Sequence, residues 1–303
     1  MVETVSGPIS ADQLGVTLPH EHIFIDRSRD YGIDAYLADI ELAIREVQIF
    51  KDLGGSTIVD CSTCEIGRKP GLLREVSERT GVHVVMGTGH YRRPYLDEAW
   101  MDGHSVEEIA EGLIRDLTVG VGDSEIRAGV IGEIGSNGSI ISAVEERSFR
   151  AAARAHLAVG ATISTHAALF PVGHKQLDIL IHEGVPADRV VIGHCDTVPD
   201  SEYHASLAAR GAFVQFDTLH VQSEYDLARR VEFVVRLVEA GHGRRVLMSH
   251  DICLRSHLTA LGGKGYGFVI TGFVPRLKAA GLRDAQINDI LVDNPRRALS
   301  GED

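Results

Sequence analysis

Two histidines stand two positions apart near the N-terminus, within the segment VTLPHEHIFI that begins at Val16. Side chains alternate between the two faces of an extended strand, so His20 and His22 point the same way and Glu21 points the opposite way. Two imidazoles on one face can hold a divalent metal ion. Because an H-x-H pair also arises often by chance, it predicts a metal site only together with further ligands elsewhere in the chain.

Four more potential ligands stand late in other segments that favour strands. They are Glu133, His166, His194 and Asp251. A cluster of four imidazoles and two carboxylates in an apolar environment costs free energy unless a partner satisfies it, and divalent metal does so. Six ligands exceed the need of one tetrahedral ion and predict two ions with open positions for a substrate. Imidazole and carboxylate without thiolate suit zinc, our first choice, or Mn, Co or Fe. A buried hydrogen-bond network without metal is the alternative.

Short β-branched segments recur along the chain, and each precedes a longer amphipathic stretch, as expected of repeated βα units. The expected strands begin at Val16, Ser56, Val82, Ile126, Ala161, Arg189, Ala212 and Arg244. Eight strands close a barrel. The competing doubly wound sheet would carry a glycine fingerprint after its first strand, which is absent from the sequence. We therefore predict an α/β fold, a (β/α)8 TIM barrel, in which residues 1–303 form a single domain.

The stretch LADIELAIREVQIFKDLGG illustrates the predicted helices. Its spacing places four apolar side chains on one side, and two glycines end it. These side chains are Ile40, Ile44, Val47 and Leu53.

In such a barrel the active site lies at the C-terminal ends of the strands, where the six candidate ligands fall. Histidines in helical or connecting segments are expected on the surface or in packing, and these are His83, His104, His156, His174, His182, His204 and His242. His250 adjoins Asp251 and should point away from the barrel interior. Cys61 and Cys64 form a lone C-x-x-C, which we assign to packing because structural zinc sites usually need a second pair.

Composition excludes several classes of partner. The formal net charge of −13 argues against nucleic acid, which normally requires a basic face. No run of about 18 apolar residues and no signal-peptide pattern occurs, so we expect a cytoplasmic protein without a membrane partner. Four cysteines are too few for a disulfide scaffold in a chain of 303 residues. A symmetric homodimer is the default expectation for a soluble enzyme.

Four motifs resemble the phosphotriesterase family of the amidohydrolase superfamily, and especially its branch of phosphotriesterase homology (phosphotriesterase-related) proteins. They are LPHEH at 18–22, ISTHA ending at Ala167, IGHCD ending at Asp196 and SHD ending at Asp251. The resemblance extends through GTGHY at 87–91, AGVIGEIG at 128–135, VQFDT at 214–218 and VDNPRR at 292–297. It implies a (β/α)8 barrel with a binuclear centre. On this resemblance His20, His22 and Asp251 hold one ion, His166 and His194 hold the other, and the fourth-strand residue bridges.

Three positions depart from the phosphotriesterases proper. Their bridging residue, like that of the related lactonases, is a carboxylated lysine, whereas the matching position here is Glu133, as in the homology-protein branch. Their acid and histidine that relay a proton from the catalytic aspartate correspond to Thr197 and Thr218. Conversely, Tyr91 falls where the lactonases place a tyrosine next to the metal-bound hydroxide. The resemblance thus implies a lactone, carboxyl ester or amide substrate more than a phosphotriester.

The predicted mechanism is attack of a metal-bridging hydroxide on a carbonyl, with Asp251 as proton acceptor and donor. Arg255 and Lys264 lie in the glycine-rich segment after the eighth strand, which we expect to form a mobile loop that meets an anionic group of a small-molecule substrate. Two alternatives remain at this level. One is phosphotriesterase or phosphodiesterase activity on organophosphates, and the other is a metal-stabilised barrel that binds a small ligand without turning it over.

Overall fold

The computed structural model describes residues 1–221 and 223–302. Asp303, the last residue of the predicted domain, lies outside the described residues. Eight parallel strands form one sheet in the order β12-β11-β10-β9-β8-β7-β6-β3. Their bounds are β3 Val16–Glu21, β6 Gly55–Asp60, β7 His83–Thr88, β8 Val130–Gly135, β9 Ile163–His166, β10 Val190–Gly193, β11 Phe213–Phe216 and β12 Val246–Met248.

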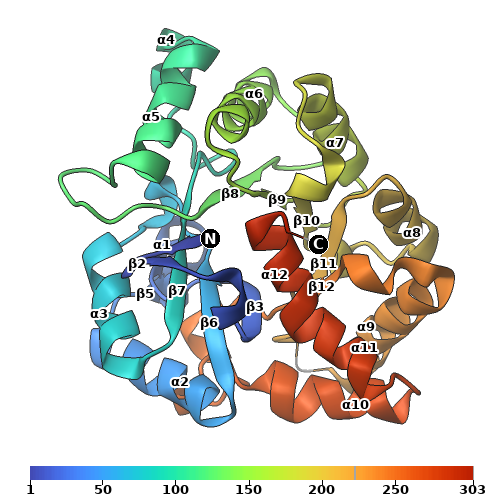
Figure 1. The fold of residues 1–303 in the computed structure, drawn as a ribbon. Coiled ribbons are helices and arrows are strands. Elements are labelled where there is room, and N and C mark those ends of the chain that lie inside the picture. The colour runs from blue at the N-terminus through green and yellow to red at the C-terminus, as the bar shows by residue number, and fades with distance from the viewer. Residues whose placement is uncertain (222, 303) are drawn as a thin grey trace.

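The sheet curves until its first and last strands meet (Figure 1). The backbone N–H of Asp251, just after β12, donates to the carbonyl of His20 in β3 over 3.3 Å. The structure is thus the predicted (β/α)8 barrel. Two small antiparallel pairs lie outside it, formed by β1 (Val2–Thr4) with β2 (Gly7–Ile9) and by β4 (Ile25–Asp26) with β5 (Tyr36–Leu37).

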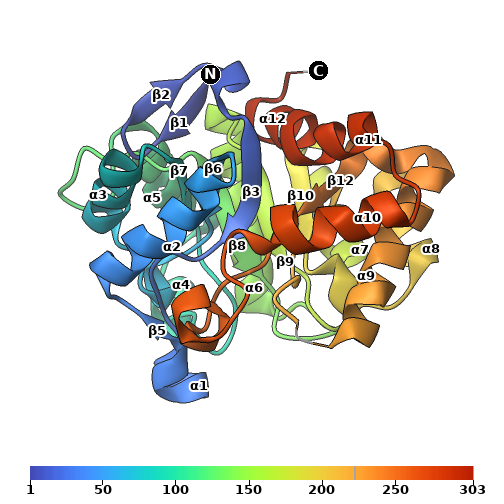
Figure 2. The same cartoon turned by 90° about the horizontal axis from the view of Figure 1, so that it is seen from below.

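Helices surround the barrel, and the two chain termini lie together at one end (Figure 2). In the described part of the chain no helix is long and apolar enough to cross a membrane. The helices are α1 Ser28–Tyr31, α2 Ile40–Asp52, α3 Pro70–Thr80, α4 Glu98–Gly103, α5 Val106–Thr118, α6 Ala143–Val159, α7 Gly173–His182, α8 Ser201–Ala209, α9 Glu224–Leu237, α10 Val274–Ala279, α11 Asp284–Asn288 and α12 Asn294–Ser300.

Each of the eight predicted strand segments overlaps a barrel strand, but most of the strands begin later than the predicted segment, and β6 begins one residue earlier. The fourth predicted segment starts at Ile126, whereas β8 starts at Val130. The predicted face of α2 is wrong in part. Val47 is fully buried, yet Leu53 is exposed, and the helix instead buries Leu42 and Phe50 against the barrel. Leu42 and Phe50 are buried because α2 packs both on β6 and beside α3, whereas Leu53 lies beyond the last helical residue, Asp52.

Helix ends follow local sequence rules that also fix the loops at the mouth of the barrel. Ser142 precedes α6 and forms a capping box with Glu145, the pairing that satisfies the free N–H groups of a first turn. The other carboxylate oxygen of Glu145 accepts the N–H of Asn137 at 2.8 Å and that of Arg93 at 3.3 Å. One buried carboxylate therefore holds the loops that follow β7 and β8.

Glu21 fastens the first strand to the segment after the last one. Its side chain points out of the barrel, as the alternation predicted, and is fully buried. The carboxylate accepts hydrogen bonds from Ser249 Oγ at 2.7 Å, from the backbone N–H groups of His250 and Ile252 at 2.8 Å each, and contacts His250 Nδ1 at 2.8 Å. His250 likewise points away from the interior, as predicted. This carboxylate closes the barrel where β3 and β12 meet.

Replacing Glu21 with Ala is expected to lower the free energy of unfolding by about 3–5 kcal/mol, because several buried donors lose their acceptor together. Denaturant unfolding followed by circular dichroism measures the change. The matched control is Glu41→Ala, which removes an exposed carboxylate paired with Arg79 and should leave the midpoint almost unchanged. Equal midpoints for the two variants would contradict the closing role of Glu21.

Candidate metal centre and active site

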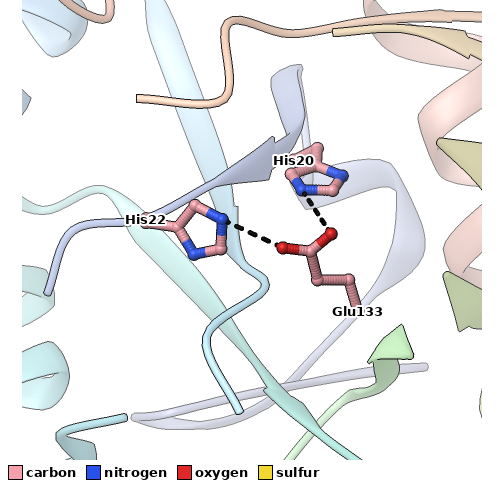
Figure 3. A group of neighbouring side chains, drawn as sticks. All are labelled: His20, His22 and Glu133. Carbon is pink, nitrogen blue, oxygen red and sulfur yellow. Dashed lines mark ion pairs between the residues drawn. The ribbon is translucent and has the colours of Figure 1, made fainter. Parts of the chain in front are cut away.

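The structure brings the six predicted ligands together at the C-terminal ends of five strands. His20 lies within β3, and the others lie in or directly after their strands: His22 after β3, Glu133 in β8, His166 at the end of β9, His194 after β10 and Asp251 after β12. Figure 3 shows the rings of His20 and His22 pointing toward the carboxylate of Glu133. Apart from the partly exposed His166 and Asp251, these residues are at most 2% exposed.

The carboxylate of Glu133 lies at the middle of the cluster. Its Oε1 is 3.3 Å from His22 Nε2, while its Oε2 is 2.9 Å from His166 Nδ1 and 3.2 Å from His194 Nε2. Gly132, which precedes it, has a φ of +143°, and a Cβ there would overlap the carbonyl of Ser164. Glycine therefore lets β8 approach β9 closely enough for Glu133 to reach both groups of histidines.

Asp251 approaches the cluster from the opposite wall. Its Oδ1 is 3.2 Å from His22 Nε2 and 4.0 Å from His20 Nε2. Its other oxygen, Oδ2, lies 4.0 Å from Cys253 Sγ. One oxygen of Asp251 thus joins the pair of histidines on β3, and the other faces the cavity wall.

These residues fit a divalent metal centre. His20 Nε2 is buried and has no hydrogen-bond partner among the described residues, although it faces Glu133 Oε2 at 3.6 Å. Several ligand atoms lie 3.2–3.3 Å apart, close to the roughly 3.3 Å separation of two nitrogen or oxygen ligands on one tetrahedral zinc ion. The side chains form two compact groups that share Glu133, namely His20 with His22 and His166 with His194. Buried His and Glu groups of this kind can hold metal.

One carboxylate behind the cluster fixes two of the imidazoles. Asp217, after β11, contacts His194 Nδ1 at 2.8 Å and His20 Nδ1 at 3.2 Å. Gln215 donates to Asp217 at 2.7 Å. Such partners fix the ring orientation of histidines that bind metal. Asp217 was not among the predicted site residues, although the alternation along β11 places Gln215 and Asp217 on the same inward face and could have indicated it.

His22 is oriented in the same way by a different group. Ser62 Oγ lies 2.9 Å from His22 Nδ1 and donates to the carbonyl of Phe24. Asp60, at the end of β6, accepts the N–H groups of Ile23 at 2.7 Å and Ser62 at 3.0 Å. The loop that carries His22 is therefore tied to the neighbouring strand.

Two of the ligands have a left-handed backbone, which residues other than glycine rarely adopt. The φ angles of His194 and Asp251 are +55° and +54°. The N–H of His194 is held by the Asp217 carboxylate at 3.0 Å, and the N–H of Asp251 by the carbonyl of His20. Strain of this kind persists only where surrounding contacts determine the backbone, and it concentrates at functional sites.

Burial and neighbouring charge shift the pKa values of the ligands. Burial lowers the pKa of His22, but hydrogen bonds with Asp251 and Glu133 outweigh it and raise the pKa to about 10. Burial raises the pKa of the Asp251 carboxyl, but His22 and the other imidazoles hold it well below its usual range. Burial and the neighbouring His194 lower the pKa of His166 to about 3. His22 is thus a protonated imidazole near pH 7 and must lose that proton to bind a metal.

A cavity of about 480 Å³ opens above the cluster, a size suited to a small molecule. His166, His194 and Asp251 form part of its lining. Its walls also include His220 and His257, whose rings stack with centroids 3.9 Å apart. His20, His22 and Glu133 are buried and do not line the cavity.

None of the three predicted substrate contacts lines this cavity. Tyr91 is fully buried, although its hydroxyl comes within 3.4 Å of His166 Nδ1. Arg255 lines a separate small recess. Lys264 donates to the carbonyl of Val221, and its Nζ lies 4.3 Å from the Phe268 ring centroid.

The predicted mobile loop is also fastened. Glu46 of α2 accepts the N–H groups of Thr259 and Ala260 at 2.9 and 2.8 Å. The cationic side chains at the cavity are instead Arg27 and Arg92.

The two threonines at the relay positions do line the cavity. Thr218 Oγ1 donates to Asp196, which also pairs with Arg230 at 2.8 Å. Thr197 Oγ1 donates to the carbonyl of His194. Neither hydroxyl is an acid or base suited to relay a proton near neutral pH.

The two cysteines of the C-x-x-C motif lie in different environments. Cys61 is buried in the core, as predicted for packing. Cys64 is exposed, and its Sγ forms a small group with the carboxylate of Glu65 and the ring of His90. Packing therefore accounts for Cys61 alone.

Comparison with known proteins gives close relatives along the whole chain. The phosphotriesterase homology protein of Escherichia coli is 34% identical over 288 residues, which are 95% of this chain and 98% of that protein. Its crystal structure has a TM-score of 0.91 to this fold. The N-acetyltaurine hydrolase of Dictyostelium discoideum is 29% identical over 362 residues, covering 99% of this chain and 97% of the relative. A lactonase from Listeria monocytogenes is 28% identical with a TM-score of 0.93, covering 100% of this chain and 99% of that one.

The fold, the cluster and these relatives define the protein as a metal-dependent hydrolase. The sequence profile of the phosphotriesterase family matches residues 1–299. The chain belongs to that family, as its motifs had implied.

Metal binding is expected to strengthen as pH rises, because His22 must give up a proton to become a ligand. Between about pH 6 and 8, apparent zinc affinity should increase about tenfold per pH unit for each proton displaced. Competition with a chelator of known pH dependence measures this. Calorimetry in buffers of different ionisation enthalpy counts the protons released. An affinity that does not change over this range would contradict the assignment of His22 as a ligand.

Proposed function

We propose that this chain hydrolyses a carbonyl substrate, a lactone, carboxyl ester or amide, at a centre of two divalent ions. The proposed ligands are His20, His22 and Asp251 for one ion and His166 and His194 for the other, with Glu133 between them. The observation that carries this proposal is the position of Glu133, which turns Oε1 toward His22 and Oε2 toward His166 and His194.

When bound, the two ions, zinc being our first choice, supply an activated water near neutral pH and polarise the carbonyl oxygen. Asp251 is the proton carrier of the reaction. It lines the cavity, its Oδ1 is engaged by His22, and its Oδ2 faces the wall beside Cys253. The carboxylate accepts a proton as the water oxygen bonds to the acyl carbon. It returns the proton to the leaving oxygen or nitrogen as the bond to that atom breaks.

Several observations favour a carbonyl over a phosphotriester. Thr197 and Thr218 stand where a relay would need an acid and a base, and both hydroxyls are held by their neighbours. Two of the relatives are named for activity on carbonyl compounds, a lactonase and an N-acetyltaurine hydrolase. N-acetyltaurine, the compound in the second name, is an amide that also carries an acid group. We extend this to the present chain by proposing a small anionic substrate.

Replacing Asp251 with Asn is expected to lower turnover by about a hundredfold or more, since amide nitrogen cannot carry the proton. Metal content should stay close to that of the wild type, because the Asn oxygen remains available to the ion. Steady-state hydrolysis and elemental analysis of the same preparation measure the two quantities. Asp178→Asn, an exposed change on α7, is the matched control. Turnover in Asp251→Asn within about threefold of the control would refute the assignment.

A further inference from the structure

Cys64, Glu65 and His90 form another group of potential metal ligands, outside the candidate centre. Cys64 and Glu65 begin the 3-10 helix Cys64–Ile66 in the loop after β6, and His90 lies in the loop after β7. Because β6 and β7 are neighbouring parallel strands, both loops leave the same end of the barrel. A sulfur, a carboxylate oxygen and a ring nitrogen of these residues lie within 4.8 Å of one another. The three residues are not part of the lining of the cavity above the candidate centre.

Contacts within this group orient the side chains before any ion binds. His90 Nδ1 lies 2.7 Å from Glu65 Oε1, and the other oxygen of Glu65 accepts the backbone N–H of Tyr91 at 3.4 Å. The Trp100 ring packs against the His90 ring with centroids 5.2 Å apart. The side chains of Glu65 and His90 are 11% and 14% exposed, whereas Cys64 is exposed to solvent. An ion from solvent would therefore meet ligands that are already in place.

The hydroxyl of Thr63 indicates independently that this group lacks a component. Thr63 is fully buried directly before Cys64, and its Oγ1 lies beside the Glu65 carboxylate. Among the described residues no hydrogen-bond partner satisfies that oxygen. A buried hydroxyl without a partner costs free energy. A water molecule carried by a cation at Glu65 would supply the missing partner.

The chemistry of the three side chains suits zinc. Thiolate, imidazole and carboxylate are the ligands that zinc takes in proteins, and on a tetrahedral ion they lie about 3.3–3.8 Å apart. Small side-chain rotations would bring Cys64, Glu65 and His90 from their present spacing to this one. Burial and the Glu65 carboxylate raise the pKa of the Cys64 thiol to about 12, so the thiol is neutral near pH 7. Zinc would replace the thiol proton, which is released to solvent.

The charges also balance. A thiolate at Cys64 and the carboxylate of Glu65 carry two negative charges, which equal the charge of one zinc ion. The guanidinium of Arg68 acts on Cys64 as well, but it pairs with Asp116 at 2.9 Å. The group thus has no surplus charge once an ion is bound.

We propose that Cys64, Glu65 and His90 bind one zinc ion at the surface, with water as the fourth ligand, separately from the two ions proposed for the candidate centre. Three protein ligands and water are the set found at open zinc sites. Because this ion is exposed, exchange into metal-free buffer is expected to remove it and to leave the buried centre filled. The ion fastens the loop after β6 to the loop that carries Tyr91. This site does not depend on the reaction that the candidate centre carries out.

Titration with Co²⁺ tests the site, because cobalt bound to a thiolate has a strong charge-transfer absorption in the near ultraviolet. The ligands of the candidate centre are imidazoles and carboxylates, so cobalt bound there lacks this absorption. The protein is exchanged into metal-free buffer and then titrated with Co²⁺ until the spectrum is constant. We expect the absorption of one cobalt–thiolate bond per chain. An excess of zinc should remove it, because zinc binds such ligands more tightly than cobalt does.

Two variants assign this absorption to the proposed ligands. Cys64→Ser is expected to abolish it, and His90→Gln to weaken cobalt binding at this site by about tenfold or more. His104→Gln is the matched control for His90→Gln. The His104 ring also packs against Trp100, with centroids 4.3 Å apart, but it offers no ligand to the group. The control should therefore bind cobalt as the wild type does.

Alkylation with iodoacetamide gives a second measurement that needs no cobalt. Cys64 is exposed, whereas Cys61, Cys195 and Cys253 are buried, so the reagent should modify Cys64 first. Zinc is expected to slow this modification about tenfold or more in the wild type, because a zinc-bound thiolate is shielded from the reagent. Peptide mass mapping identifies the modified cysteine. In His90→Gln the same zinc concentration should give little protection.

Absence of a thiolate absorption, together with no protection of Cys64 by zinc, would overturn the proposal. An absorption that persists in Cys64→Ser would also overturn it and would assign the bond to Cys253, whose Sγ lies 4.0 Å from Asp251 Oδ2. Cobalt affinity that is unchanged in His90→Gln, or lowered equally in His104→Gln, would contradict the ligand set. These results are independent of hydrolysis. A protein that shows the Cys64 absorption and hydrolyses no carbonyl substrate keeps this site and overturns only the proposed function, and hydrolysis without the absorption does the reverse.

Discussion

The arrangement of side chains at the mouth of the barrel depends on the contacts that the carboxylate of Glu133 makes with the surrounding histidines. Its two oxygens face histidines from three strands at distances of 2.9–3.6 Å. Glu133 is only 1% exposed, and an isolated charge buried to this extent would destabilise the fold. Burial raises the pKa of its carboxyl, but the surrounding imidazoles hold that pKa well below its usual range. A glutamate can occupy this position without the carboxylation that a lysine there would need. The remaining ligands are arranged around it.

Three of the four imidazoles in this cluster are backed by a group that fixes their orientation. Asp217 holds His20 and His194, and Ser62 holds His22. Farther out, Glu21 fastens β3 to the segment that carries Asp251. The carboxylates therefore form successive layers from the centre to the outer wall of the barrel. These contacts hold the left-handed backbone of the candidate ligands His194 and Asp251 in place.

The barrel and the polar residues at its mouth could be predicted from the sequence because side chains alternate between the two faces of a strand at every second residue. Alternation along strands places His20 and His22 inside and Glu21 and His250 outside, and the structure agrees. The face of α2 could not be read from apolar spacing alone, because the helix packs against both a strand and a second helix and Leu53 lies beyond its last residue.

Loop residues escaped prediction because their positions depend on distant parts of the chain. Arg255 and Lys264 had the composition of an anion site, but Glu46 of α2 fixes their loop and neither residue lines the cavity. Arg92 lines the cavity in a loop that Glu145, far along the sequence, holds through the backbone N–H of the next residue, Arg93. No local pattern around Arg27 or Arg92 carries this information.

We propose that Glu133 holds two metal ions in one centre. The most direct measurement is elemental analysis of the purified protein and of its Glu133→Ala variant, with the exposed Glu202→Ala as control, after the same exchange into metal-free buffer. We expect about two ions per chain in the wild type and the control, and loss of most of the metal in Glu133→Ala. A wild type without bound metal, or a Glu133→Ala variant that keeps both ions, would contradict it.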